Sequence, residues 1–144
     1  MMKLEYPLDD EARAFLRRVE EFGRAEVAPF ADQWDHDEQL PREIFTKAGK
    51  LGLMGMVAPT EYGGLGLSYV TAALAVKELG KQYASLAMDI AAHNALAVGQ
   101  INMFGTEEQK RAYLPRLTSG EWIGGWGLTE PNAGSDTGGI ETKA

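Results

Sequence analysis

A glycine-rich stretch in the last part of the chain carries the residue types best suited to chemistry. It reads GGWGLTEPNAGSD, from Gly124 to Asp136, and sets four glycines beside the side chains of Thr129 and Ser135. Glycines let a backbone come close to a ligand, and successive N–H groups can form a concavity that binds anions. A wide turn, in which the polar side chains satisfy nearby backbone groups, is the alternative that composition alone favours.

Several other chemical motifs are absent. The chain has no P-loop, no G-x-S-x-G of an esterase and no H-E-x-x-H, and the GGLG at 63–66 lacks the third glycine of a dinucleotide-binding fingerprint. It has no cysteine, which excludes disulfides, thiolate metal sites and cysteine nucleophiles. We expect no metal site, and we expect His93 to lie hydrogen-bonded inside a helical bundle.

Composition bounds the class of protein. At 144 residues, with 44% hydrophobic and 24% charged residues, the chain can bury one core. Its 21 acidic residues outnumber 14 scattered basic ones, so nucleic acid is not an expected partner. The first fifteen residues, MMKLEYPLDDEARAF, lack a signal-peptide core and are too acidic for a transit peptide, which predicts a cytoplasmic protein.

Apolar spacing predicts five helices before the glycine-rich stretch. The first follows Asp9 and runs to about Pro29, and the second opens at Pro41 and ends near Gly52. Residues 52–68 are too rich in glycine for a regular element and are expected to form a structured loop. Ser68 then suits the N-cap of a third helix, which runs through Leu79.

The remaining two helices differ in character. Residues 85–104, SLAMDIAAHNALAVGQINMF, are apolar on nearly every side, which predicts the most buried helix of the bundle. Polar residues such as Asp89 and Asn94 interrupt it too often for a membrane span. Thr106 to Gln109 is a capping-box pattern that opens the last helix, expected to close near Pro115.

Beyond Glu121 the sequence changes to a strand-like pattern. The segment WIGGWGL, 122–128, predicts one strand, and residues 140–143 predict a second. The predicted fold is therefore mainly α, an up-and-down helical bundle over residues 1–120 that leads into the first strands of a β-domain over residues 121–144.

The decamer GLTEPNAGSD, 127–136, resembles the first signature of the acyl-CoA dehydrogenase family. The resemblance extends to PTEYGGLGLS at 59–68, to FGTEEQKRAYLPRLTSGEWIG at 104–124 and to GGIETKA at 138–144. It covers nearly the whole chain in order and without large gaps. In that family the decamer is the loop between the N-terminal helical domain and the middle β-domain, so the resemblance implies an N-terminal part of such an enzyme.

The resemblance implies FAD as the cofactor and assigns roles within the loop. Thr129 would hydrogen-bond the isoalloxazine edge, and Gly134 would admit the flavin without a side chain in the way. Ser135 would meet both the pyrophosphate side of FAD and the acyl-CoA substrate. The backbones of Trp126 and Leu128 would line the flavin. Three further loop residues are expected to fix its shape: Glu130, Pro131 and Asp136.

The implied reaction is α,β-dehydrogenation of an acyl-CoA thioester. A glutamate outside this chain would remove the α-proton while flavin N5 takes the β-hydride, so no catalytic residue is expected here. The family also implies an electron-transfer flavoprotein as acceptor and a homotetramer at full length. By itself the 144-residue chain is expected to be inactive and to bind FAD weakly.

Two alternatives stay open at this stage. Acyl-CoA oxidases and some flavin monooxygenases share the fold and a related loop. In a third interpretation the helical domain is a non-catalytic interaction module, with apolar helix faces at 15–22 and 85–104 available to partners. Flavin absorbance of the purified protein would separate the enzymes from the module.

Overall fold

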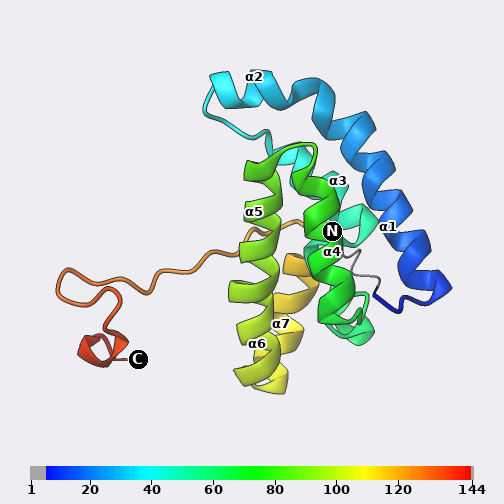
Figure 1. Cartoon of the computed structure of the whole chain (residues 1–144). Helices are drawn as coiled ribbons and strands as arrows, with labels where there is room; N and C mark the ends of the chain where they lie inside the picture. Colours follow the sequence, from blue (N-terminus) through cyan, green and yellow to red (C-terminus); the bar gives the residue numbers. More distant parts are fainter. Residues whose placement is uncertain (1–5, 144) are drawn as a thin grey trace.

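The computed structural model describes residues 6–143, which fold into a helical bundle followed by an extended segment (Figure 1). Residues 1–5, which belong to the N-terminal stretch used to predict localisation, lie outside the described part, and so does Ala144. The α-helices are α1 (Asp10–Phe22), α2 (Ala31–His36), α3 (Arg42–Leu51), α4 (Tyr69–Gly80), α5 (Ala84–Ala92), α6 (Gly99–Phe104) and α7 (Glu107–Thr118). A π-helical stretch, His93–Val98, joins α5 and α6 into one rod.

Helix α1 begins where the sequence predicts. Asp9 caps it by accepting a hydrogen bond of 2.7 Å from the backbone N–H of Ala12, and its apolar stripe is buried. The prediction that this helix runs to about Pro29 is confirmed: α1 continues through a π-turn (Gly23–Val27), and a 3₁₀ turn (Ala28–Phe30) then leads into α2. Pro29 sits in the first turn of that new segment, where its missing N–H costs little.

The second helix and the loop after it are confirmed. Helix α3 follows Pro41 and ends at Gly52, whose φ of 90° is in the left-handed region. The loop that follows holds two 3₁₀ turns, Leu53–Gly55 and Thr60–Tyr62. Backbone hydrogen bonds cross it, including Leu65 N–H to the carbonyl of Gly55 at 2.9 Å, so it is a structured loop without strand pairing.

Both predicted caps are present. The Ser68 hydroxyl accepts from Thr71 N–H at 3.1 Å at the start of α4, and Thr106 and Gln109 form a complete capping box at the start of α7. Helix α7 does not close near Pro115 but continues to Thr118. Thr118 is buried and its hydroxyl donates to the carbonyl of Tyr62 at 2.8 Å, which holds the last turn in place.

The rod at 85–104 is the more buried of the two long helical segments, as predicted. Eight of its 20 residues are buried, against five of the 19 residues at 9–27. One side of the rod nonetheless faces outward, although the segment is apolar on nearly every side. Met88, Leu96, Met103 and Phe104 are all exposed on that side.

The two predicted strands are not formed. Residues 122–129 and 140–143 have no strand assignment, and the described chain contains only an isolated bridge between Glu130 and Ala133. A strand is defined by a partner, and no second extended segment lies beside residues 122–128 to complete a ladder. In Figure 1 the segment from about residue 120, coloured orange to red, runs away from the bundle.

The bundle is held by one main core and a smaller one. The main core gathers buried side chains from α1, α3, α4, α5 and the loop after α3, with Phe15, Met54, Leu79 and Ile90 almost fully enclosed. The smaller core joins α7 to the rod through Leu114, Leu117 and Val98 and to the loop through Tyr62. Within residues 6–143, no helix is long and apolar enough to cross a membrane.

Candidate functional site

The glycine-rich segment is tied to the bundle at Gly124 by a buried histidine. His93 is 0% exposed, its Nδ1 accepts a hydrogen bond of 2.9 Å from Gly124 N–H, and its Nε2 lies 3.0 Å from the carbonyl oxygen of Met54. Because Nδ1 accepts, the ring proton must sit on Nε2 and be donated to that carbonyl. Burial lowers the pKa of His93, which keeps the ring neutral as this arrangement requires. The prediction of a hydrogen-bonded histidine inside the bundle is confirmed.

The neighbouring Asn94 fastens the same rod to the loop after α3. Its amide nitrogen donates to the carbonyls of Leu53 and Ile90, at 2.7 and 2.9 Å, and its amide oxygen accepts from Met56 N–H at 3.0 Å. Asn94 and His93 therefore turn inward together and bind residues 53–56 side by side. Sequence reasoning did not assign a role to Asn94, because its partners lie 38 and 41 residues away.

The chain segment just before Gly124 is fixed to the bundle surface. Gly120 adopts φ of 77°, which turns the chain out of α7, and Trp122 N–H donates to the carbonyl of Arg116 at 2.9 Å. The Arg116 guanidinium lies 4.7 Å from the centre of the Trp122 ring, and Arg42 donates to the carbonyl of Glu121. The exit of the chain is thus held from both α7 and α3.

Beyond Gly124 the segment is shaped by its own hydrogen bonds. Glu130 and Ala133 exchange backbone bonds of 2.9 and 3.2 Å across a tight turn, and the Glu130 carboxylate accepts from Glu141 N–H at 2.9 Å and Thr142 N–H at 3.0 Å. These bonds lower the pKa of Glu130. Asp136 accepts from Gly138 N–H at 3.1 Å. The expected shaping role is therefore confirmed for Glu130 and Asp136.

The residues proposed for the flavin lie together on this exposed segment. Trp126 is 49% exposed and Leu128 is 40% exposed, and Thr129, Gly134 and Ser135 are also exposed. Within the described residues, the hydrogen bonds of residues 125–142 all stay inside that segment. The structure thus collects hydroxyl groups and open backbone on one loop, and these groups face outward from the bundle.

The glycines of the loop differ from those of the bundle. A Cβ added at Gly64 would run into the carbonyl of Ala58, and one at Gly120 would meet the carbonyl of Phe45. At Gly125, Gly127 and Gly134 an added Cβ would meet nothing within 4 Å, and none of the three has a left-handed φ. Neither packing nor backbone conformation within residues 6–143 requires glycine at these three positions.

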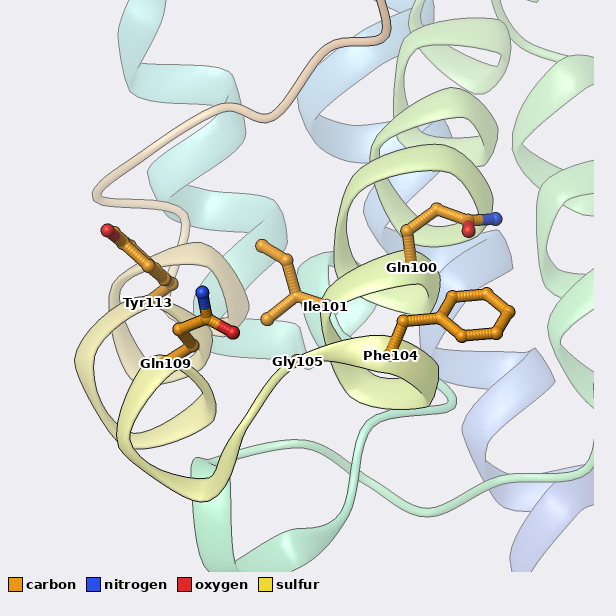
Figure 2. Close-up of a pocket in the computed structure, with 6 residues that line it drawn as sticks. All are labelled: Gln100, Ile101, Phe104, Gly105, Gln109 and Tyr113. Carbon is orange, nitrogen blue, oxygen red and sulfur yellow. The ribbon is translucent and has the colours of Figure 1, made fainter. Parts of the chain in front are cut away.

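Two hollows in the bundle lie apart from the loop residues. One, of about 380 Å³, lies between α6 and α7, where Figure 2 shows Ile101 and Phe104 with the amides of Gln100 and Gln109 and the ring of Tyr113. The other, of about 320 Å³, lies between α4 and α5 over small side chains such as Ala72 and Ala91. Neither lining contains a carboxylate or a basic group, so neither hollow is equipped for acid–base chemistry. Among residues 6–143 no cluster of three metal-ligating side chains occurs.

These observations define the class of structure. It is an up-and-down helical bundle followed by a glycine-rich polar loop that begins after α7. The chain belongs to the acyl-CoA dehydrogenase family, because the family model "Acyl-CoA dehydrogenase, N-terminal domain" matches residues 9–121.

Similar proteins extend this match through the loop. The chain is 44% identical over 141 residues to "Probable acyl-CoA dehydrogenase YngJ" of Bacillus subtilis, covering 98% of this chain and 37% of that protein. Butyryl-CoA dehydrogenase from Megasphaera elsdenii has a similar structure, with a TM-score of 0.86, 35% identity and coverage of 96% of this chain and 37% of that one. A glutaryl-CoA dehydrogenase from Mycobacterium smegmatis, solved in complex with FADH2, gives a TM-score of 0.86 at 34% identity over 94% of this chain and 35% of that one. The chain therefore spans little more than a third of these relatives.

Proposed function

We propose that the protein containing this chain is an FAD-dependent acyl-CoA dehydrogenase, in which residues 1–120 form the helical domain and residues 121–144 begin the middle β-domain. The three open glycines carry the proposal, because a glycine that residues 6–143 do not need is explained by a surface that approaches from outside them. The end of the family match at residue 121 supports the domain boundary.

The residues present fit a flavin. The backbone at Gly125, Gly127 and Gly134 is open to close approach, and the exposed hydroxyls of Thr129 and Ser135 are donors suited to the polar edge of an isoalloxazine and to a pyrophosphate. Thr129 would bind the flavin edge, and Ser135 would bind the pyrophosphate side together with acyl-CoA. The backbones of Trp126 and Leu128 would line the ring.

In the proposed reaction this chain binds and orients, and it performs no proton transfer. Bound FAD would supply the hydride acceptor, taking a hydride from the β-carbon of the acyl thioester at N5. The α-proton goes to a glutamate outside these 144 residues, and the product is the α,β-unsaturated thioester. The two electrons leave through an electron-transfer flavoprotein, and the proposed assembly is a cytoplasmic homotetramer.

Acyl-CoA oxidase and flavin monooxygenase chemistry on the same fold are the alternatives, and the oxidant that restores the flavin separates them. The dehydrogenase names of the relatives favour the first proposal. A non-catalytic interaction module would use the helix faces, but it leaves the open glycines of the loop without a purpose.

A hybrid enzyme tests the proposal. Residues 1–144 replace the aligned segment of the Megasphaera elsdenii butyryl-CoA dehydrogenase, to which they are 35% identical. We expect the hybrid to purify with flavin, and we expect butyryl-CoA to bleach that flavin without oxygen. Reoxidation is expected to be fast with an electron-transfer flavoprotein and slow with oxygen. A folded hybrid without flavin would contradict the proposal, and fast reoxidation by oxygen would favour an oxidase.

The isolated chain provides the complementary measurement. One loop supplies a minority of the contacts to the cofactor, and each lost hydrogen bond costs about 1 kcal/mol, so losing several lowers affinity by orders of magnitude. We expect the 144-residue chain to show no acyl-CoA-dependent bleaching of added FAD. Bleaching would mean that a second chain completes the site or that a carboxylate of this chain serves as base, and Glu121 and Glu130, nearest the loop, would be replaced first.

A further inference from the structure

His93 joins two segments that are remote in sequence, and the proposed flavin chemistry does not use it. Its Nε2 side bonds Met54, 39 residues earlier, and its Nδ1 side bonds Gly124, 31 residues later. The side chain is fully enclosed, so each of its polar atoms is satisfied by backbone and not by solvent. A buried ring that is bonded at both edges has its orientation fixed.

The same stretch of helix also receives Gly124 sterically. A Cβ at Gly124 would overlap the Cβ of Ala97, so the backbone there lies directly on the rod. His93 and Ala97 belong to the π-helical stretch His93–Val98, where Gly99 N–H bonds the carbonyl of Asn94 five residues earlier. Single π-turns inside α-helices are rare and are found frequently at functional sites. One turn of the rod thus supplies both the acceptor for Gly124 N–H, which is His93 Nδ1, and the side chain against which Gly124 packs, which is Ala97.

Among the described residues, this contact is the last hydrogen-bonded tie between the bundle and the loop. Hydrogen bonds of residues 125–142 remain inside that segment, and the preceding tie to the bundle is the bond from Trp122 N–H to the carbonyl of Arg116. Without the bond at Gly124, the loop would pivot at Trp122, two residues earlier. The direction in which Trp126 and Leu128 leave the bundle would then no longer be set by the rod.

We propose that His93 is a positioning residue for the loop: its Nδ1 lone pair holds Gly124 N–H, and donation from Nε2 to Met54 keeps the ring in the tautomer that leaves that lone pair free. The inference rests on the proposed function, because it gives the 127–136 loop a flavin to face. The hydrogen bonds themselves require no flavin, so they can be tested separately.

Two substitutions divide the functions of the ring. In His93→Asn the amide oxygen lies where Nδ1 lay, so an acceptor for Gly124 N–H is kept and the donor to Met54 is lost. In His93→Gln the longer amide reaches toward the Nε2 position, so a donor to Met54 is kept and the acceptor for Gly124 is lost. The measurements, on the 144-residue chain, are ¹⁵N shifts of the His93 ring, hydrogen exchange of the Gly124 amide and ¹⁵N relaxation of residues 125–128.

The expected results are specific to positioning. The wild-type ring shows the neutral Nε2–H tautomer. Exchange at Gly124 becomes about tenfold faster in His93→Gln, because one hydrogen bond of about 1.4 kcal/mol is lost, and it stays near wild type in His93→Asn. Order parameters of residues 125–128 fall only in His93→Gln. Protection of the Met56 amide, which Asn94 holds, reports that the bundle is intact.

Three outcomes would overturn the inference. The first is a wild-type ring protonated on Nδ1, which needs no variant and no intact mutant fold. The second is unchanged Gly124 exchange in His93→Gln with Met56 still protected. The third is equal loosening of residues 125–128 in both variants. Failure of the flavin proposal has a different signature, namely a hybrid enzyme that folds without flavin while Gly124 remains protected.

Discussion

The bundle and the loop use the same residue type for opposite purposes. Glycines in the bundle, such as Gly64 and Gly120, bring one stretch of this chain against another, and a side chain there would strike a carbonyl. Glycines in the loop, such as Gly127 and Gly134, touch nothing within residues 6–143. The buried polar side chains of the bundle all have hydrogen-bond partners within it. The loop is shaped by its own hydrogen bonds, but nothing in residues 6–143 packs against its open glycines. We therefore propose that the loop packs against a surface that residues 6–143 do not supply.

The largest expected effect is in the bundle, at Asn94. Replacement by alanine removes the side-chain partner of the Leu53 carbonyl and of the Met56 N–H in a buried site, and such groups cost about 1–3 kcal/mol each. We expect Asn94→Ala to lower the free energy of unfolding by about 3 kcal/mol, measured by urea denaturation. Asn102→Ala, on the partly buried part of the same rod, is the control and is expected to change it by about 0.5 kcal/mol or less.

A matched pair of glycines tests the comparison itself. Gly64→Ala drives a methyl group into the carbonyl of Ala58, and overpacking of this kind costs about 1–3 kcal/mol. Gly134→Ala places the same methyl in open space and is expected to leave the free energy of unfolding within about 0.5 kcal/mol. Equal losses in the two variants would remove the distinction between the two sets of glycines.

The next effect is the dependence of stability on pH. The pKa of His93 is lowered from 6.5 by burial, which outweighs the opposing effect of the backbone carbonyls of Met54 and Leu117. The unfolded state therefore binds a proton more readily, so this contribution is fully present above about pH 6.5 and is lost as the pH falls toward the folded pKa. We expect the wild type to lose more stability between pH 7.5 and 5 than His93→Asn loses. The His36→Asn variant should keep the wild-type dependence of the free energy of unfolding on pH. If it lost that dependence, the effect would belong to His36 and not to His93.

The smallest effect is confined to the loop. Glu130→Gln keeps the size of the side chain but removes the charge that accepts from the amides of Glu141 and Thr142. Hydrogen exchange of those two amides is expected to rise a few-fold, since bonds to a charged acceptor are stronger than neutral ones. Exchange at Met56 should not change. A loss of protection in the bundle would show that the loop and the bundle are one cooperative unit.

Local chemistry made the helices predictable. Asp9, Ser68 and Thr106 each cap the helix that the sequence assigns to them, because a cap depends on residues within three positions. The helix end at Pro115 was placed too early, because the tertiary burial of Leu117 and Thr118 outweighs the proline rule.

Contacts between distant residues were not predictable in the same way. The sequence suggested that His93 is buried and bonded, but Met54 and Gly124 could not be named as its partners without the fold. The strands predicted at 122–128 and 140–143 failed for a related reason. Alternation and glycine spacing describe a single segment, while a strand needs a neighbour that the described chain does not supply.

The flavin content of the hybrid enzyme with Gly134→Val tests the central claim most directly. A valine side chain points into the space where the flavin is proposed to lie and where this chain places nothing within 4 Å. The account predicts a hybrid that folds with the stability of its parent and purifies without flavin, while Gly138→Ala, whose methyl group faces Asp136 of the same loop, keeps it. Normal flavin content in the Gly134→Val hybrid would contradict the account.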